Sequence, residues 1–264
     1  MSHQDITSLH SHHVERVKAL LGSRGKKVRK EEGIFVADGI QSVRAALTSD
    51  RFPLVGLYLT EKGEERLKTD SPDIVLPPDT YRVSDAVMSE MSDTETPQGI
   101  LALLRIASSQ LDLAECKKIA LFWQIQDPGN AGTVIRAADA CGFDAVIFTS
   151  ESVDVFSPKV VRSTAGSLWN IPVVSDFTLH QIFAPEFSLH SKLIFDGKGK
   201  SSLVGLDVPE KLIAVFGNEG RGLPEFEELV SAGGIGVNIP MHGGAESLNV
   251  ASAASIAMFQ LGGL

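Results

Sequence analysis

Cysteine is nearly absent from this sequence, which has only Cys116 and Cys141 among its 264 residues. Both lie in apolar surroundings, far apart in the chain. This pattern excludes a disulfide framework and a cysteine-based zinc site, and no metal is expected. The two residues are therefore interpreted as reduced core thiols of a cytosolic protein.

Long apolar runs are absent as well. No stretch reaches the roughly 18–20 apolar residues that a membrane-spanning helix needs. The N-terminal segment lacks a basic head followed by an apolar block, so no signal peptide is expected. We predict a cytoplasmic protein without a membrane partner.

Positive charge is scarce overall, since the formal net charge is −9. This negative net charge argues against electrostatic binding of nucleic acid over the whole protein surface. Basic residues nevertheless gather in one short stretch, in which Glu15 is the acidic residue. The basic cluster consists of Arg16, Lys18, Arg24, Lys26, Lys27, Arg29 and Lys30. On charge alone it fits either a solvated helix face or a local phosphate contact. Four of the seven histidines precede it, and we interpret them as part of a mobile polar terminus rather than a metal site.

The first half of the chain predicts a small α/β unit. Its apolar periodicity and turn residues predict the following elements: helices at 14–22, after Asp38-Gly39 and from Asp85, and strands at 34–37, 54–60, 74–84 (broken by prolines) and 100–107. We assign residues 1–108 to this domain and the polar segment 109–118 to a linker.

In residues 119–264 strands and helices alternate regularly. The expected strands begin near residues 119, 144, 171, 192, 211 and 234, and the expected helices occupy 131–142, 157–170 and 247–261. Such alternation is typical of an α/β fold with a parallel sheet covered on both faces. The loops that follow the strands, 126–136, 216–223 and 239–249, would meet at the carboxyl edge of that sheet, where open α/β sheets bind ligands.

The first two loops carry isolated polar groups. Asn130 is predicted to be a helix N-cap. Arg136 lies in a largely apolar helix and therefore needs a carboxylate partner or an anion such as phosphate. The glycine-rich loop around Glu219 matches neither a P-loop nor a dinucleotide fingerprint, and its carboxylate could pair with Arg136 or stay on the surface.

The third loop leads into a helix that is apolar on nearly every side, which predicts burial all round. Ser247 is expected to cap this helix. Asn249 stands in the expected first turn, where a second cap is not needed, so a ligand role is the alternative.

Taken together, "NAGTVIR", "FGNEGRGL" and "IPMHGGAESLNVASAASIAM" resemble the three motifs of the SpoU/TrmH family of RNA ribose 2′-O-methyltransferases, which belong to the SPOUT class. The first half, with "RGKKVRKEEGIFVADGIQSVRAAL" and "SDTETPQGILAL", resembles the substrate-binding domain of many members. The common family form has Glu where this chain has Asp38.

The resemblance implies a C-terminal domain with a trefoil knot that binds S-adenosylmethionine, preceded by a small α/β RNA-binding domain. It implies five contacts to the methyl donor and no metal. These residues are Gly217, Ile239, Met241, Ser247 and Leu248.

By the same resemblance, four residues act in catalysis: Asn130, Arg136, Glu219 and Asn249. The arginine would orient the ribose and stabilise developing negative charge, because a free guanidinium stays protonated. The implied RNA contacts are Arg24, Lys26, Lys27 and Arg29. A homodimer through the C-terminal domain is also expected.

Ribosomal RNA is the first choice of substrate and transfer RNA the second. Two readings stay open beside these. One is a non-catalytic RNA-binding or assembly protein that keeps the fold, and the other is a methyltransferase for a small molecule or protein.

Overall fold

The computed structural model describes residues 4–107 and 111–262, which form two compact units. The first unit contains the described residues up to 107 together with 156–170, and the second contains 111–155 and 171–262. The segment 156–170 thus packs with the first unit, although the sequence places it in the second predicted domain. Part of the predicted linker lies outside the described residues.

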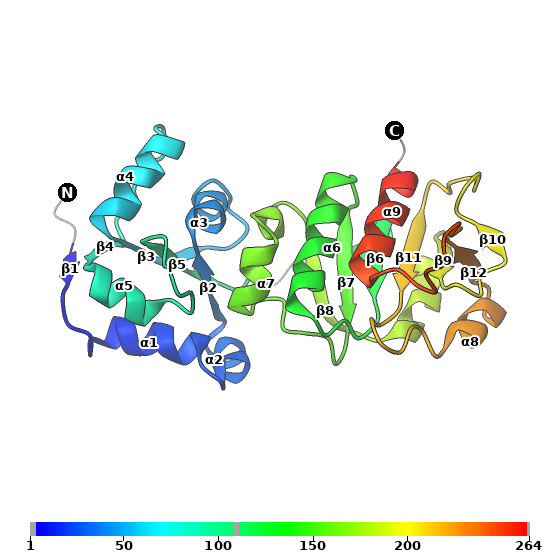
Figure 1. Ribbon diagram of the computed structural model, residues 1–264, viewed down its shortest axis with the longest axis horizontal. Coiled ribbons are helices and arrows are strands. Elements are labelled where there is room, and N and C mark those ends of the chain that lie inside the picture. The colour runs from blue at the N-terminus through cyan, green and yellow to red at the C-terminus, as the bar shows by residue number, and fades with distance from the viewer. Residues whose placement is uncertain (1–3, 108–110, 263–264) are drawn as a thin grey trace. The chain divides into compact units, whose positions relative to one another are not determined.

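The first unit is built on a mixed sheet of five strands in the order β1-β4-β3-β5-β2 (Figure 1). Strand β5 runs antiparallel to β2 and β3, whereas β1, β4 and β3 are parallel. The strands are β1 (Gln4–Ile6), β2 (Ile34–Asp38), β3 (Leu54–Leu59), β4 (Thr80–Val83) and β5 (Ile100–Arg105). The helices are α1 (His12–Leu21), α2 (Gly25–Glu32), α3 (Ile40–Leu47), α4 (Glu61–Asp70), α5 (Asp85–Met91) and α7 (Pro158–Ser163), with a 3₁₀ turn η2 (Ser167–Trp169).

The prediction of a mobile N-terminus is wrong for the described residues. Strand β1 pairs with β4, and His13 lies in α1, where its Nδ1 is 2.9 Å from the Tyr58 hydroxyl. Helix α1 is capped by Ser11 and buries Val14, Val17 and Leu20 in the core of this unit. Residues 4–13 are therefore mostly polar and yet form a strand and the start of a helix that packs on the core. The remaining residues of that stretch lie outside the described part.

An aromatic cluster attaches the segment 156–170 to the first unit. The Phe156 ring lies 4.9 Å from Phe35 and 5.8 Å from Phe52, measured between centroids. Trp169 packs on the same two rings, and the Arg51 guanidinium donates to its carbonyl at 3.1 Å. Buried aromatic side chains contribute about 1.5–3 kcal/mol each, so this segment is part of the unit's core.

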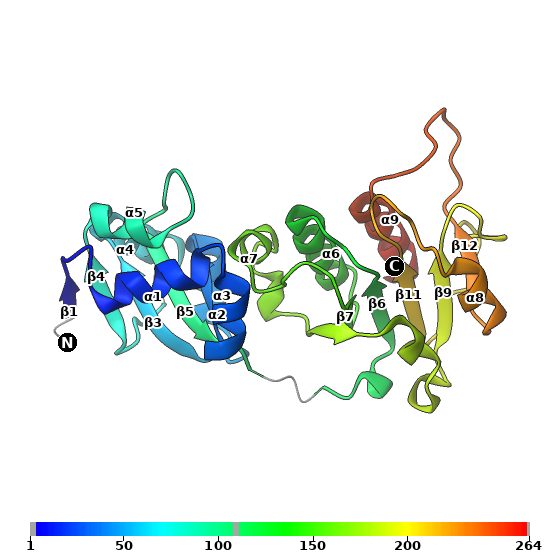
Figure 2. The same ribbon diagram turned by 90° about the horizontal axis from the view of Figure 1, so that it is seen from below.

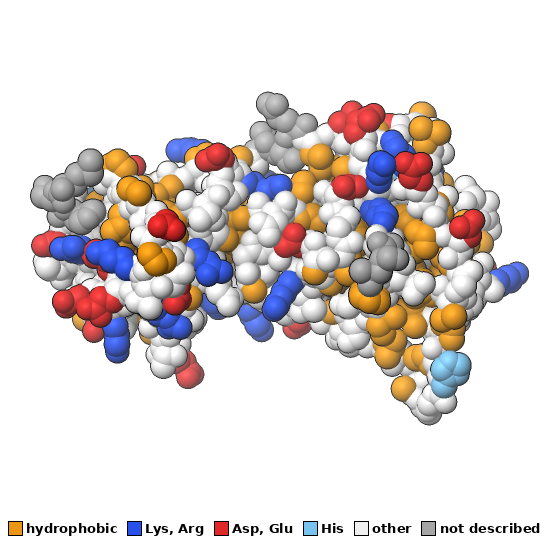
Figure 3. Space-filling view, turned by 90° about the horizontal axis from the view of Figure 1, so that it is seen from above, with side chains coloured by type: hydrophobic (Ala, Val, Ile, Leu, Met, Phe, Trp, Pro, Cys, Tyr) orange, Lys and Arg blue, Asp and Glu red, His pale blue; other side chains and the backbone are white. Residues whose placement is uncertain are grey.

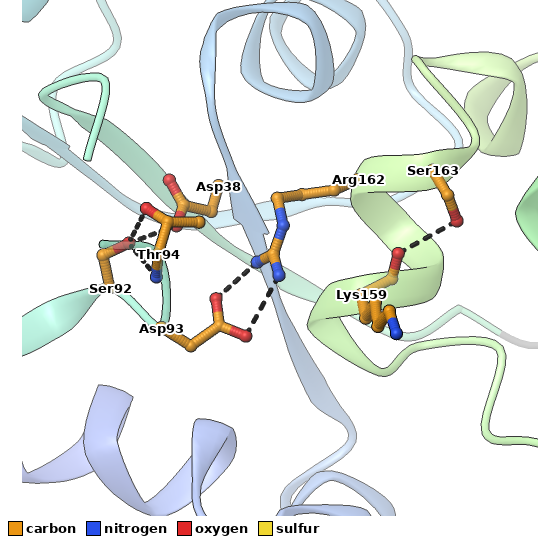
Figure 4. Close-up of polar contacts among 7 residues, drawn as sticks. All are labelled: Asp38, Ser92, Asp93, Thr94, Lys159, Arg162 and Ser163. Atoms are coloured by element: carbon orange, nitrogen blue, oxygen red, sulfur yellow. Dashed lines mark hydrogen bonds and ion pairs between the residues drawn. The ribbon is translucent and has the colours of Figure 1, made fainter. Parts of the chain in front are cut away.

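Polar contacts strengthen the same attachment (Figure 4). Arg162 of α7 forms a two-point ion pair with Asp93. The next residue back, Ser92, donates to the buried Asp38 carboxylate at 2.6 Å. Burial raises the pKa of Asp38, and the Ser92 hydrogen bond opposes that rise. The loop 92–99 is thereby held between the end of β2 and α7.

The second unit is a seven-stranded sheet in the order β10-β12-β9-β11-β6-β7-β8, parallel throughout. Its strands are β6 (Lys118–Phe122), β7 (Ala145–Thr149), β8 (Val173–Phe177), β9 (Ser191–Phe195), β10 (Ser201–Ser202), β11 (Leu212–Phe216) and β12 (Ile235–Asn238). Its helices are α6 (Pro128–Ala140), α8 (Phe226–Ser231) and α9 (Val250–Gly262), with 3₁₀ turns η1 (Leu113–Glu115), η3 (Leu179–Phe183) and η4 (Pro185–Phe187). The expected α/β class with a parallel sheet is confirmed.

The central strands of this sheet are buried on both faces, as parallel strands require. Phe122, Phe195 and Phe216 stack across adjacent strands with centroids 4.8–5.1 Å apart. Both cysteines are free thiols, and burial raises the pKa of the Cys116 thiol to about 11. Among the described residues, no helix is long and apolar enough to span a membrane.

Helix α9 corrects the prediction of a helix buried all round. It packs beside α6 (Figures 1 and 2) and buries Ala254, Ala257 and Met258. The side of α9 that carries Ile256 and Phe259 is open, with 46% and 60% of these residues exposed. An apolar helix therefore presents an uncovered face in the single chain.

Candidate active site

Three loops leave the carboxyl edge of the parallel sheet beside one another. They follow β6, β11 and β12, and β11 pairs directly with β6. The loop 239–249 projects from the sheet before it returns to α9 (Figure 2). The three sequence motifs therefore meet where an open α/β sheet binds ligands.

Asn130 belongs to the first turn of α6 and is not its N-cap. The cap is Asp127, whose Oδ1 accepts a hydrogen bond from the Asn130 backbone N–H at 2.9 Å. Pro128 occupies the first turn, where backbone N–H groups have no acceptor within the helix. The lack of an N–H in proline therefore removes no helical hydrogen bond. The Asn130 side chain is thereby released from capping and can bond to other loops.

The Glu219 carboxylate binds the first loop to the second. Its Oε1 accepts from the Asn130 side-chain amide at 3.1 Å and from the Asp127 N–H at 3.3 Å. Its Oε2 accepts from the Asn218 amide at 3.2 Å and from the Gln126 N–H at 3.4 Å. Four N–H donors hold the carboxylate, so of the two alternatives left open for Glu219 the pairing with Arg136 is wrong.

Asn249 caps α9 and also bonds to another motif loop. Its Oδ1 accepts from the N–H groups of Ala251 at 2.9 Å and Ser252 at 3.2 Å, so it caps α9. Its Nδ2 donates to the Asn130 Oδ1 at 3.1 Å. The prediction that Ser247 caps this helix is wrong, because α9 begins at Val250.

A continuous chain of hydrogen bonds therefore joins the three motifs, from Glu219 through Asn130 to Asn249. Each side-chain amide has its oxygen and nitrogen assigned by its partners. The Glu219 carboxylate accepts hydrogen bonds from N–H groups, and this fixes the donor-to-acceptor direction of the whole chain. Such a network keeps the three loops in one arrangement.

Arg136 does not join this network. It lies six residues beyond Asn130 on α6, which places it about 120° around the helix. Its side chain is exposed, and within the described part of the chain it has no hydrogen-bond or ion-pair partner. The structural ion pair considered from the sequence is therefore wrong, and the guanidinium is free for an external anion.

A cavity of about 330 Å³ opens beside the network. It is bounded by the ends of β9, β11 and β12, by the glycine-rich loop and by the start of α9. All five predicted donor-binding residues line it: Gly217, Ile239, Met241, Ser247 and Leu248. This size falls at the lower end of small-molecule sites, about 300–1,000 Å³.

The glycine-rich loop forms the wall of the cavity through its backbone. Asn218 and Gly222 exchange backbone hydrogen bonds of 2.7 and 3.0 Å, which closes a tight turn. A Cβ atom on Gly217 would come within 2.5 Å of the Gly222 carbonyl group. Only glycine allows the turn to fold back so closely. A flat adenine ring needs such a shape, with backbone groups and apolar side chains around it.

Sequence reasoning missed three residues around the cavity. Asp196 lines it directly after β9, and the rule that ligands bind beyond strand ends could have identified it. Asn218 braces the loop by donating to the Gln124 carbonyl at 2.6 Å. Arg221 lies over the Trp123 ring at 5.2 Å, a contact between loops that no local pattern shows.

The predicted RNA contacts separate into two groups. Arg24, Lys26 and Lys27 are exposed on or just before α2, although Lys27 lies 3.7 Å from Glu31. Arg29 is only 6% exposed, and its guanidinium donates to the Leu20 carbonyl. It is therefore a core residue, and its assignment to RNA binding is wrong.

Carboxylates neutralise other members of the basic cluster. Arg16 pairs with Glu32 at 2.8 Å, and Lys18 pairs with Glu90. The charge that remains is centred on Arg24, Lys26 and Lys30, which are exposed and have no ion-pair partner within residues 4–107 and 111–262. The described residues contain no group of three or more His, Cys, Asp or Glu side chains arranged to hold a metal.

Comparison with protein families assigns both parts of the chain. Residues 117–259 match the SpoU rRNA Methylase family, and residues 14–102 match the MRM3-like substrate binding domain. A similar curated protein is the 23S rRNA (guanosine(2553)-2′-O)-methyltransferase RlmP of Bacillus subtilis. It is 32% identical over 94% of this chain and 96% of its own. Another is the 23S rRNA (uridine(2479)-2′-O)-methyltransferase of Streptomyces viridochromogenes, 27% identical over 92% and 86%.

Solved structures agree with this assignment. The AdoMet-bound rRNA methyltransferase from Sinorhizobium meliloti superimposes with a TM-score of 0.79 at 27% identity, over 98% of this chain and 97% of its own. The SpoU methyltransferase AviRb from Streptomyces viridochromogenes has the same fold, with a TM-score of 0.80 over 96% of both chains at 24% identity.

A cavity at the carboxyl edge of a parallel sheet, lined by the second and third motif loops, fits a methyltransferase of the SPOUT class. The chain belongs to the SpoU rRNA methylase family. It is an enzyme, and the class expected from its motifs, an S-adenosylmethionine-dependent RNA ribose 2′-O-methyltransferase, is confirmed.

Proposed function

We propose that the protein methylates a ribose 2′-hydroxyl of ribosomal RNA, using the cavity beside Gly217 for S-adenosylmethionine. The observation that supports this most directly is the hydrogen-bond chain from Glu219 to Asn249, which fixes the three motif loops beside that cavity. Two similar proteins carry names that specify 23S rRNA, and this favours rRNA over tRNA. Because rRNA is the proposed substrate, we place the protein in the cytoplasm.

The cavity residues fit the proposed methyl donor. Gly217 has no side chain, so its backbone can contact the donor directly. The apolar walls of the cavity come from Ile239, Met241 and Leu248. Ser247 shapes the last loop. S-Adenosylmethionine, when bound, supplies a methyl group that its positive sulfur has already activated, so the site needs no metal. We also propose that the loops after β11 and β12 form the family's trefoil knot.

The acceptor hydroxyl is a weak nucleophile and loses its proton as it attacks. A guanidinium group has hydrogen-bond donors and no acceptor, so Arg136 is not proposed as a literal base. Its free guanidinium is suited to hold the phosphate next to the target ribose and to stabilise negative charge on the 2′-oxygen. Asn130 and Asn249 present the acceptor to the cavity, and Glu219 holds Asn130 in place.

We propose a homodimer that joins two copies through the open face of α9. Ile256 and Phe259 of this helix border a hollow with Val204, Pro240 and Met241. Figure 3 shows hydrophobic side chains gathered on this part of the second unit. An exposed apolar patch of this kind marks an interaction surface. In such a dimer Arg136, which lies outside the cavity of its own chain, would serve the site of the partner.

Converting the α9 face to a charged one should therefore prevent dimer formation. We expect the wild-type protein to have twice the chain mass in light scattering and the Ile256→Asp/Phe259→Asp variant to be a monomer. Leu189→Asp is the control, because Leu189 is also an exposed apolar residue of the second unit but lies outside the patch. A wild-type monomer, or a double variant that stays dimeric, would contradict the proposal.

The basic residues left free on α2 should make RNA binding sensitive to salt. Lys26 and Lys30 lie one helical turn apart and are both exposed. We expect Lys26→Glu/Lys30→Glu to weaken rRNA binding at least about tenfold at low salt, and to lower the slope of log affinity against log salt by about 2. Donor affinity should not change. The control is Arg44→Glu/Arg105→Glu, with equal charge change at exposed sites of the same unit. An equal loss in both variants would disprove a specific role for α2.

The enzymatic proposal is tested by transfer of labelled methyl groups. The protein is incubated with methyl-labelled S-adenosylmethionine and either unmodified rRNA or unmodified tRNA, and the RNA is digested to nucleosides. We expect label on ribose and only in rRNA. Label in tRNA alone would show that the substrate is tRNA and not rRNA. Donor binding without transfer to either RNA would favour a non-catalytic RNA-binding protein.

A further inference from the structure

All the charged residues that line the cofactor cavity are acidic. Its lining contains the carboxylates of Asp196, Glu219 and Glu246, and no lysine, arginine or histidine of the described chain. S-Adenosylmethionine carries one positive charge more than its product, because its sulfur is a sulfonium and the product is a thioether. The surroundings of the cavity therefore distinguish these two ligands by charge as well as by shape.

The three carboxylates differ in how well they are fixed. Glu246 is exposed on the projecting loop, where water screens it. Glu219 is fixed, but four N–H donors already surround its two oxygens. Asp196 combines a fixed position with a free oxygen.

The backbone holds Asp196 in place at the end of β9. Its N–H donates to the Val237 carbonyl at 3.1 Å, and its own carbonyl accepts from Gly199 at 3.0 Å. Its Oδ1 accepts from the Lys198 N–H at 3.0 Å. Its Oδ2 has no hydrogen-bond partner in the described chain, and no ion pair neutralises the carboxylate there.

Asp196 also lies against the tight turn that shapes the cavity. The position of a Cβ atom on Gly222 would be 3.9 Å from the Asp196 Oδ2. Because Asp196 is half-buried and shares the cavity lining with apolar Phe195 and Val237, its charge is less screened than that of a surface carboxylate. A cation in the cavity would gain from it directly.

We propose that Asp196 makes the cofactor cavity selective for the methyl donor, whose sulfur is a positive sulfonium, over the product, whose sulfur is a neutral thioether. The inference rests on the proposed use of this cavity for S-adenosylmethionine. Methyl transfer removes the charge of the sulfonium and so removes the attraction between the ligand's sulfur and Asp196. The same carboxylate thereby favours donor binding and product release.

The test measures binding to the full-length protein by calorimetry, with three ligands. S-Adenosylmethionine and sinefungin both carry a positive charge at the sulfur position, and S-adenosylhomocysteine does not. In Asp196→Asn, which keeps an acceptor for the Lys198 N–H, affinity for the two charged ligands should fall about tenfold. Affinity for S-adenosylhomocysteine should change less than about twofold.

Two controls separate this effect from a general change in charge. Asp207→Asn removes an exposed carboxylate outside the cavity lining and should leave all three affinities unchanged. Glu246→Gln removes an exposed lining carboxylate and should change the ligand preference less than Asp196→Asn does.

The outcomes identify which proposal fails. If the wild-type protein binds none of the three ligands, the proposed use of the cavity is wrong. If the wild-type protein binds them and Asp196→Asn weakens all three equally, Asp196 contacts a part that they share and charge selectivity is wrong. Unchanged affinities in Asp196→Asn would also overturn the inference.

Discussion

Replacing Arg136 with alanine is expected to lower kcat for RNA methylation by about 10²–10³-fold. The affinity for S-adenosylmethionine should stay within about twofold of the wild-type value, because Arg136 does not line the cavity. The guanidinium is exposed and unpaired within the described residues, so its loss leaves no buried partner behind. The folded protein should therefore keep its thermal stability. Single-turnover kinetics and calorimetry measure the two quantities separately.

Arg136→Lys is the matched variant, because it keeps the charge but loses the planar, two-point geometry. We expect its rate to lie between those of the wild type and the alanine variant. A lysine variant as slow as the alanine variant would indicate that geometry dominates. An alanine variant with the wild-type rate would contradict any role of Arg136 in catalysis.

Mixed dimers show which site Arg136 serves. A dimer of one Arg136→Ala chain and one Glu219→Gln chain has one intact site if the arginine acts on the partner's cavity. Random mixing should then restore about a quarter of the wild-type activity. If Arg136 acts in its own chain, each site keeps one defect and the mixture should stay inactive.

Gly217→Ala is expected to weaken S-adenosylmethionine binding by about 100-fold, since a displacement of about 1 Å in a site can have that effect. The new methyl group would meet backbone atoms of Gly222 at 2.5 Å and the Leu223 nitrogen at 2.8 Å. Backbone cannot rotate away as a side chain can, so the turn that forms the cavity wall must move. Calorimetry with the donor measures the loss.

Gly220→Ala provides the control within the same loop. Its added Cβ would find its nearest neighbour, the Asn218 Oδ1, at 3.8 Å, which is an ordinary contact. We expect this variant to bind the donor within about twofold of the wild type. If both variants bind equally well, the close approach of Gly217 to Gly222 is not what shapes the cavity.

Much of the site could be predicted because motifs are local. All five residues expected to contact the donor line one cavity, and Asn130, Glu219 and Asn249 are joined by hydrogen bonds. These contacts follow from loops that leave parallel strands of one sheet at the same edge. The β–α alternation of the second half predicted that edge correctly.

The helix caps were mispredicted for two different reasons. In "DPGN" both Asp127 and Asn130 are suitable caps, but a proline favours the first helical turn, which selects Asp127. That information was present in the sequence. The choice of Asn249 over Ser247 depends on how the loop 239–249 passes from β12 to α9, where Asn249 contacts Asn130 of α6, a tertiary contact.

The burial of Arg29 could not be predicted from its neighbours. It stands in a run of basic residues, yet its partner is the Leu20 carbonyl at the end of the preceding helix. Gly25 allows this approach, since a Cβ there would lie 2.6 Å from the Arg29 guanidinium. The short turn between α1 and α2 thus converts one member of a charged run into a core residue.

The segment 156–170 has a consequence for synthesis of the chain. Domains generally fold as units while the ribosome is still translating, N-terminal parts first. Here the first unit needs Phe156, Arg162 and Trp169 to complete its aromatic core and its ion pair with Asp93. Strands β6 and β7 of the other unit are therefore made before the first unit is complete. The N-terminal unit acquires its final core only after residue 170 has left the ribosome, when the chain has already started its second sheet.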